Sequence, residues 1–231
     1  MNLGIVTSFY NGYDRFLTRW VSSICRLKVK PAYVVMYASG PMADKRNKYS
    51  AIELLKIAGI NHLFLETREH LGMGYARNHA VRNCMTKWIM YLDVDDTILP
   101  NATRSIGQYE NLADVICTGL KVVGDRKNKA FIYTDTTRES ILAGKHGSSS
   151  HSVYKKSIWE KAPYIETNDY IEQPLWLGFA QAGATFIGTK ELCTVYHSRK
   201  DGHNLSMTKT QKEEARLQYK QFLKDGVHPH G

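Results

Sequence analysis

The sequence predicts an α/β fold in which a mixed, mostly parallel central sheet is flanked by helices. Strand-like and helix-like segments alternate through the first half of the 231 residues, which is the pattern that places helices on the faces of a sheet. The wholly apolar segment 88–92 is typical of a strand at the centre of such a sheet. Hydrophobic residues make up 43% and charged residues 23% of the chain, so the composition supports a buried core and argues against a disordered, collagenous or coiled-coil protein.

Four apolar segments in the first 92 residues have the character of strands. They are Leu3–Phe9, Tyr33–Ala38, Ile60–Leu65 and Lys87–Leu92. The second is broken by Gly40 and Pro41, and the fourth runs directly into Asp93. We therefore expect strands that end in turns and, for the fourth, in acidic side chains.

Three helices are predicted between these strands. The apolar positions of the first recur at helical spacing, at Phe16, Trp20, Ile24 and Leu27. Asp14 is placed to cap this helix. The second helix covers 51–58 and ends at Gly59, and the third covers 75–85.

The second half of the chain, from about residue 117, is rich in Gly, Ser and Thr and is predicted to be loop-rich and built around the first half. A helix over 175–182 follows Pro174 and ends at Gly183. The segment 208–224 is amphipathic, which predicts a C-terminal helix packed on the body of the protein.

The net charge of +9, from 31 Lys and Arg against 22 Asp and Glu, is spread along the chain and favours an anionic partner. Nucleic acid, an anionic membrane face and a phosphorylated small molecule all satisfy it. The longest apolar runs are too short to span a bilayer, and the chain enters its first strand almost at once, without room for a cleavable leader. The four cysteines lie far apart, without a C-x-x-C pair. Together these features predict a cytoplasmic protein.

Three carboxylates follow the fourth strand, in Asp93-Val94-Asp95-Asp96-Thr97. Open α/β sheets bind ligands at the carboxyl ends of their strands. On an extended backbone Asp93 and Asp95 point to one side and Asp96 to the other, so the first two can share a hard divalent cation. We predict a Mg²⁺ or Mn²⁺ site that bridges phosphates; the alternative is a turn and helix cap ahead of Pro100.

Two other functions compete for this acidic loop. Asp93-x-Asp95-x-Thr97 also resembles the nucleophile loop of haloacid dehalogenase-like phosphatases, in which the first Asp attacks phosphate and the second is the acid/base. That loop usually lies near the start of the chain, whereas 92 residues precede it here, and Gly124-Asp125 is a poor substitute for the later Asp pair. A non-enzymatic nucleic-acid-binding protein is the third hypothesis, although clustered carboxylates would repel phosphate without a metal.

Three segments resemble, in order and spacing, a family 2 glycosyltransferase with the nucleotide-diphospho-sugar transferase (GT-A) fold. They are the opening strand and loop Ile5–Asn11, the helix start Leu71-Gly72-Met73-Gly74-Tyr75-Ala76-Arg77-Asn78, and the acidic segment Trp88–Pro100. The resemblance implies a hexosyltransferase that binds a nucleotide-sugar donor. The donor-binding residues that it implies are Thr7, Phe9, Asn11, Ser39, Arg77, Asp93, Val94 and Asp95.

The segment 172–183 is similar to the family region in which an acidic pair precedes a helix. The register places Glu172 where the family has its catalytic Asp, and Asp169 is the alternative base. A carboxylate is needed there because the acceptor hydroxyl must lose its proton as it attacks the anomeric carbon. The alternative for Glu172 is an ordinary helix N-terminal acid.

The closing segments 196–199 and 202–206 resemble the family loop in which a His completes the metal site. His203 and His197 are equal candidates, beside Asp95 and Asp93, for binding Mn²⁺ or Mg²⁺. The family often reads the nucleobase with an acidic turn after the second strand, but Tyr37-Ala38-Ser39-Gly40-Pro41 stands there, so the donor nucleotide stays open.

The resemblance implies an inverting, metal-dependent transfer and a chain in three parts. These are a nucleotide-sugar-binding half at 1–115, an acceptor-binding half at 116–207, and a C-terminal helix and tail at 208–231. Ser149, His151 and Trp176 are the candidate acceptor-binding residues, the last with core packing as an equal alternative. Two acceptor classes fit the basic charge: a lipid-linked or surface glycan reached by peripheral contact with a membrane, and a hydroxylated base in DNA or RNA.

Overall fold

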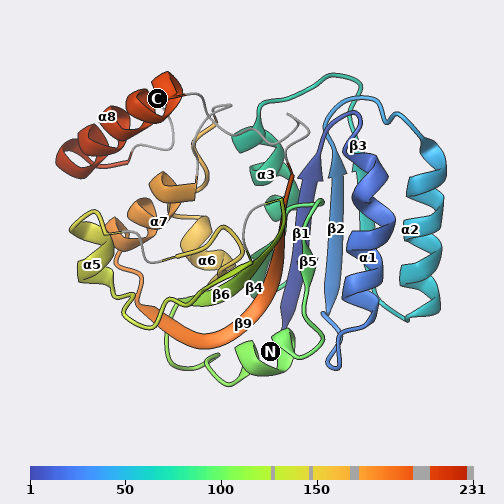
Figure 1. Ribbon diagram of the computed structural model, residues 1–231, viewed down its shortest axis with the longest axis horizontal. Coiled ribbons are helices and arrows are strands. Elements are labelled where there is room, and N and C mark those ends of the chain that lie inside the picture. Colours follow the sequence, from blue (N-terminus) through green and yellow to red (C-terminus); the bar gives the residue numbers. More distant parts are fainter. Residues whose placement is uncertain (126–127, 146–147, 167–171, 200–208, 228–231) are drawn as a thin grey trace.

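A computed structural model describes residues 1–125, 128–145, 148–166, 172–199 and 209–227 (Figure 1). Its strands form one mixed sheet in the order β3-β2-β1-β4-β8-β6-β9-β5, and β7 pairs with β6. The strands are β1 (Leu3–Phe9), β2 (Tyr33–Ala38), β3 (His62–Glu66), β4 (Trp88–Tyr91), β5 (Thr97–Ile98), β6 (Val115–Gly124), β7 (Lys129–Phe131), β8 (Val153–Lys155) and β9 (Phe186–Ser198).

The strands of the first half, β3-β2-β1-β4, are parallel neighbours. Val6 lies opposite Val35 on one side and Tyr91 on the other. Because parallel strands end at a common edge of the sheet, the segments that follow β1, β2 and β4 lie close together. This edge carries the acidic loop after β4.

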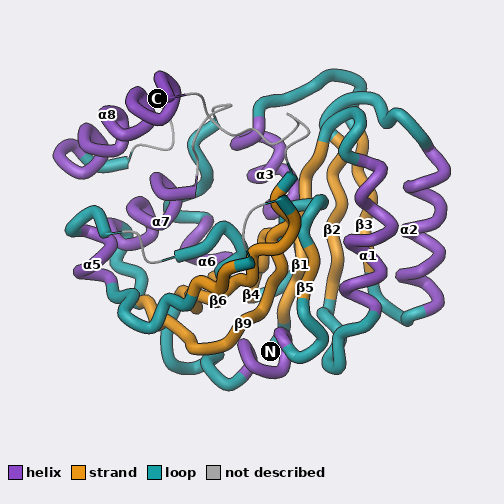
Figure 2. The backbone as a smooth tube through the Cα atoms, viewed as in Figure 1, coloured by secondary structure: helices purple, strands orange, loops and turns teal. Residues whose placement is uncertain are grey.

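Helices cover both faces of the sheet (Figure 2). They are α1 (Leu17–Cys25, preceded by the 3-10 turn Asp14–Phe16), α2 (Lys45–Ile57), α3 (Met73–Arg82), α4 (Ala102–Gly107), α5 (Arg138–Leu142), α6 (Lys156–Trp159), α7 (Glu172–Gln181) and α8 (Lys209–Asp225). Alternate residues of β1 serve opposite faces: Ile5 belongs to the core packed by α1, and Val6 to the core packed by α3, α6 and α7. The sheet is therefore buried on both sides, which explains its apolar strands.

The mixed α/β architecture with a mostly parallel half confirms the predicted fold class. The predicted first and second strands coincide with β1 and β2. Predicted and observed bounds differ most at α2, which begins at Lys45, because Asp44 caps it by accepting a hydrogen bond from the backbone N–H of Arg46. The apolar positions 51–58 that predicted this helix mark only its C-terminal part.

The second half contains long strands where the sequence analysis assigned none. β6 and β9 pair in parallel over most of their length, and β8 lies antiparallel to both β4 and β6. They curve away from the parallel strands toward α5, α6 and α7 (Figure 1). Glycines that favoured loops here permit close backbone approach: a Cβ on Gly188 would lie 1.5 Å from the carbonyl oxygen of Tyr133.

Gly74 has a similar role at the start of α3. A Cβ at this position would lie 1.8 Å from the carbonyl oxygen of Ile165. We expect Gly74→Ala to lower the free energy of unfolding by about 1–3 kcal/mol, since backbone must shift to admit the methyl group. Gly107→Ala is the matched control, because a Cβ there meets nothing within 4 Å. Urea denaturation of both variants tests this; equal stabilities would contradict the close packing of α3.

None of the helices in the described parts of the chain is both long and apolar enough to cross a bilayer. Three of the four cysteines are buried as free thiols, and Cys25 is partly exposed.

Candidate active site

The predicted donor-binding residues gather at the carboxyl edge of the parallel strands. Asn11 follows β1 and is exposed, Ser39 follows β2, and Asp93 follows β4. Besides Arg77, four of the eight have buried side chains: Thr7, Phe9, Ser39 and Val94. Ser39 uses its hydroxyl inside the protein, where it accepts from the N–H of Leu71 at 2.7 Å. In this structure these four support the shape of the edge rather than present groups to a ligand.

The acidic loop turns immediately after β4. The N–H of Asp96 donates to the carbonyl oxygen of Asp93 at 3.0 Å, which closes a turn over 93–96. The sequence analysis predicted an extended backbone that places the Asp93 and Asp95 side chains on one side. That prediction is wrong, because the chain turns here. The turn instead brings the carboxylates of Asp93 and Asp96 to the same side.

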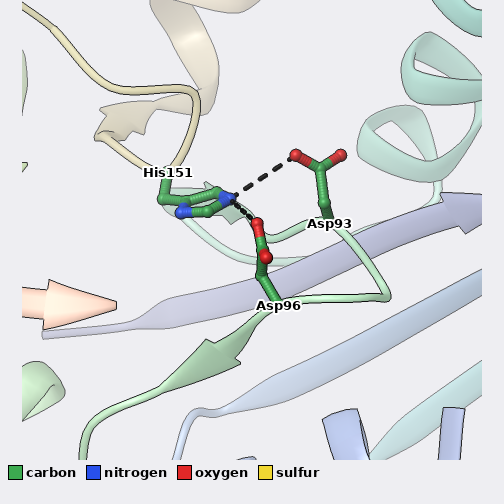
Figure 3. Close-up of side chains that lie close together, drawn as sticks. All are labelled: Asp93, Asp96 and His151. Carbon is green, nitrogen blue, oxygen red and sulfur yellow. Dashed lines mark ion pairs between the residues drawn. The ribbon is translucent and has the colours of Figure 1, made fainter. Parts of the chain in front are cut away.

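His151 lies against these two carboxylates (Figure 3). Its Nε2 is 3.1 Å from Oδ2 of Asp96 and 3.5 Å from Oδ2 of Asp93. Its Nδ1 lies 3.0 Å from the hydroxyl of Thr194 on β9. Burial lowers the pKa of His151, but the two carboxylates outweigh burial and raise the pKa to about 10. The imidazole is thus a buried cation that neutralises the acidic cluster.

Arg77 joins two predicted site residues that are 79 positions apart in sequence. Its Nη1 donates to Oε1 of Glu172 at 2.8 Å, and its Nη2 donates to Oδ1 of Asp93 at 3.2 Å. Burial works against the charge on Arg77, but Glu172, together with Tyr91 and Asp93, raises its pKa well above the usual range. The same partners act on Asp93: burial raises its pKa, while Arg77 and His151 lower it to a net value below the ordinary one. The candidate base and the acidic loop therefore belong to one site.

Asp95 lies apart from this cluster and faces arginines. Its carboxylate forms an ion pair with Arg199, and its carbonyl oxygen accepts from Arg19. Arg199 also stacks over the ring of Phe16, with its guanidinium carbon 4.1 Å from the ring centroid. Burial, followed by the charges of Asp96 and Asp93, raises the pKa of Asp95 to about 6 despite the opposing Arg199.

The side chains around the acidic loop suit a hard divalent cation. The described residues contain one group of three candidate ligands whose atoms lie within 4.8 Å of one another, namely Asp93, Asp96 and His151. Asp96 and His151 are almost completely buried, whereas the side chains of Asp93 and Asp95 are 30% and 17% exposed. Carboxylate oxygens are the ligands that Mg²⁺ and Mn²⁺ prefer. The accessible carboxylates of Asp93 and Asp95 fit such an ion and can share it with a ligand from solvent, whereas His151 cannot bind a metal while it is protonated.

Of the two histidines predicted to bind the metal, His197 and His203, the structure describes His197. Nε2 of His197 lies 3.0 Å from the hydroxyl of Thr97, and the backbone N–H of His197 donates to Oδ1 of Asp96 at 2.8 Å. Burial and then nearby Arg19 lower the pKa of His197. His203 and the alternative base Asp169 lie outside the described residues.

The three predicted acceptor-binding residues are buried. Ser149 donates to the carbonyl oxygen of Thr118 at 3.1 Å, and His151 serves the acidic cluster. Trp176 packs edge-on against Tyr154 and Phe179, which is the core packing considered as its alternative. The acceptor role predicted for these residues does not fit their burial, because none of them offers a surface to an acceptor in this structure.

Sequence reasoning missed two contributions to the site. The first is Asp96, because an extended backbone would direct it to the side opposite Asp93. The Asp-Asp-Thr sequence after a strand also favours the tight turn that is observed. The ion pair of Arg199 with Asp95 is the second, since nothing in the sequence connects the closing segment 196–199 to Asp95. Only the pairing of β5 with β9 brings these regions together, with Thr97 opposite Val195.

The sequence model of glycosyl transferase family 2 matches residues 5–159, which is more than half of the chain. The chain belongs to this family, and it is accordingly a glycosyltransferase with a GT-A fold. Family membership argues against the phosphatase and the non-enzymatic nucleic-acid-binding alternatives. A comparison with curated proteins finds no match.

Solved structures with the same fold include glycosyltransferases bound to nucleotide-sugars. TarS 1–349 of S. aureus, in complex with UDP-GlcNAc, is 15% identical, with a TM-score of 0.74; the comparison covers 99% of this chain and 68% of that one. The mannosyltransferase PcManGT from Pyrobaculum calidifontis, with GDP-Man and Mn²⁺, is 13% identical, with a TM-score of 0.69 and coverages of 99% and 66%. GalNAc-T7 with UDP, GalNAc and Mn²⁺ is 12% identical, with a TM-score of 0.68 and coverages of 97% and 50%. At these identities the similarity establishes the fold alone.

Proposed function

We propose that the protein transfers a sugar from a nucleotide-sugar to a hydroxyl acceptor in an inverting, metal-dependent reaction. The observation that carries the proposal is that one arginine, Arg77, binds both Asp93 of the acidic loop and Glu172 at the start of α7. A direct displacement needs a donor site and a base that face the same reacting carbon. Bound nucleotide-sugars in TarS and PcManGT, which share the fold, favour a donor of this class.

Asp95 and Asp93 are the residues proposed to hold Mn²⁺ or Mg²⁺, because they are the accessible carboxylates of the loop. The ion, when bound, supplies positive charge to the diphosphate of the leaving group. His151, which also pairs with Asp96, holds Asp93 from the buried side. Arg199 competes for Asp95, so ion binding requires this pair to rearrange.

Glu172 is the proposed base. The acceptor oxygen forms a bond to the anomeric carbon, the bond from that carbon to the diphosphate oxygen breaks, and the acceptor proton passes to the Glu172 carboxylate. The nucleoside diphosphate departs with the bonding electron pair. Glu172 is suited to this role because its side chain is 30% exposed while one oxygen is fixed by Arg77 at 2.8 Å.

The acceptor is proposed to be a hydroxyl on a lipid-linked or surface glycan, with a hydroxylated nucleic-acid base as the alternative. The net charge of +9 favours an acceptor at an anionic surface in both cases. Since Ser149, His151 and Trp176 are buried, the acceptor must contact other side chains near Glu172.

Product stereochemistry tests this proposal. We expect an α-linked nucleotide-sugar to yield a β-linked product, with the anomeric configuration read from the proton coupling constant in NMR spectra. A product that retains the α configuration would overturn the role of Glu172, since a retaining transfer does not need this base.

Metal affinity should depend on the protonation of Asp95. With a pKa of about 6, Asp95 is mostly ionised at pH 7, and lower pH places a proton in competition with the ion. We expect Mn²⁺ affinity, measured by titration calorimetry without donor, to fall roughly tenfold per pH unit below about pH 6. Asp95→Asn should bind Mn²⁺ weakly at every pH. Asp114→Asn is the control, because Asp114 pairs with Lys155 away from the acidic loop. Unchanged affinity in Asp95→Asn would contradict the assignment.

A further inference from the structure

The guanidinium of Arg77 is enclosed by the protein. Its side chain is only 4% exposed, and its carbon lies 4.3 Å from the ring centroid of Tyr91 and 5.6 Å from that of Tyr164. Both terminal nitrogens are engaged with protein carboxylates. The direct donor contact implied by the family resemblance does not fit this environment, because the charged group faces protein on every described side.

The two carboxylates bound by Arg77 come from different parts of the fold. Asp93 follows β4, in the parallel half, and Glu172 begins α7, which packs on the second core. The second oxygen of Asp93 faces His151. The order Glu172, Arg77, Asp93, His151, Asp96 is therefore a row of alternating charges that crosses the site, and Arg77 is its link between the two halves.

We propose that Arg77 is a positioning residue that fixes the Glu172 carboxylate relative to the acidic loop. This inference rests on the proposed function, in which Glu172 is the base. A planar guanidinium is suited to the task because it holds two carboxylates at once in a fixed geometry, whereas a lysine ammonium is a single point of charge on a flexible stem. A substitution that keeps one charge beside Asp93 but loses the second arm would leave the Glu172 carboxylate misplaced, and small misplacements of a catalytic group cost large factors in rate.

Arg77→Lys tests the positioning role, because it keeps the charge and loses the two-armed link. We expect kcat to fall at least tenfold, while the Kd of the donor, measured by calorimetry with Mn²⁺ present, changes less than threefold. The matched control is Asn78→Ser on the same helix. Asn78 donates to the carbonyl oxygen of Tyr164 and accepts from Trp159, so this variant should lower the melting temperature with little change in kcat.

The Glu172→Gln variant supplies a second measurement, which does not depend on how well Arg77→Lys folds. If Arg77 acts through Glu172, adding Arg77→Lys to Glu172→Gln should lower the residual transfer rate by less than twofold. If the rate losses of Arg77→Lys and Glu172→Gln multiply in the double variant, the inference is overturned. A donor Kd raised tenfold or more by Arg77→Lys would also overturn it. Absence of transfer by the wild-type protein with every donor would instead contradict the proposed function itself.

Discussion

Glu172→Gln should lower the rate of sugar transfer by about 10²- to 10⁴-fold while leaving donor binding unchanged. The amide has nearly the same shape as the carboxylate but cannot take the acceptor proton, and general bases contribute rate factors of this size. Arg77 would still hold Asp93, so the acidic loop should keep its geometry. Steady-state kinetics with saturating donor, together with donor calorimetry, measures both quantities.

Glu139→Gln is the control for this variant. Glu139 is also an acid in the first turn of a helix, α5, but it is exposed, and the groups that lower its pKa are its own backbone, Thr137 and Arg138 rather than Arg77. If Glu172 served only as a helix N-terminal acid, the two substitutions would have similarly small effects on stability and none on rate. Full activity of Glu172→Gln would remove Glu172 from the mechanism.

His151→Gln should destabilise the protein by roughly 3–5 kcal/mol at pH 7. Removing one partner of a buried charge cluster leaves the others uncompensated, and that loss has this magnitude. Here the uncompensated groups are Asp96, which is almost fully buried, and Asp93. Urea denaturation at pH 7 gives the difference directly.

The pH dependence of stability identifies the charge on His151. Its pKa is raised from 6.5 to about 10 on folding, so its contribution is complete below about pH 6.5 and is lost as pH rises through 10. The wild-type free energy of unfolding should therefore decline across that window, and the decline should be smaller in His151→Gln. His62→Gln is the control, because Nδ1 of His62 contacts only the carbonyl oxygen of Ile60 among the described groups. A wild-type stability that stays flat or rises across this window would contradict a buried imidazolium.

The fold of the first half could be predicted because its residues obey local rules. β1 and β2 are mostly apolar, with β-branched Ile5, Val6 and Thr7 in β1 and Val34 and Val35 in β2, and turn residues follow both strands. β6 and β9 do not follow such rules. Gly119 and Gly188 resemble loop residues when only their neighbours in sequence are considered. The structure requires glycine there because backbone from segments distant in sequence approaches too closely for a side chain.

The residues of the site could be predicted from the sequence better than their arrangement in space. Arg77, Asp93 and Glu172 were each named from sequence, and the structure brings them into contact. The extended backbone predicted after Asp93 was wrong because period-two alternation applies to strands, and the chain has already turned at Asp96; the joint metal binding by Asp93 and Asp95 stays a proposal. The burial of His151 against the acidic loop was not predicted for a related reason: its contacts with Asp96 and with Thr194 of β9 join segments that are distant in sequence.

Donor binding by titration calorimetry tests the central claim most directly. The wild-type protein with Mn²⁺ would be titrated with UDP-, GDP-, CDP- and dTDP-sugars, and the same series would be repeated without metal and with Asp95→Asn. We predict binding of at least one nucleotide-sugar that depends on Mn²⁺ and is lost in the variant. Failure of every nucleotide-sugar to bind in the presence of Mn²⁺ would contradict the assignment of the acidic loop as a nucleotide-sugar site.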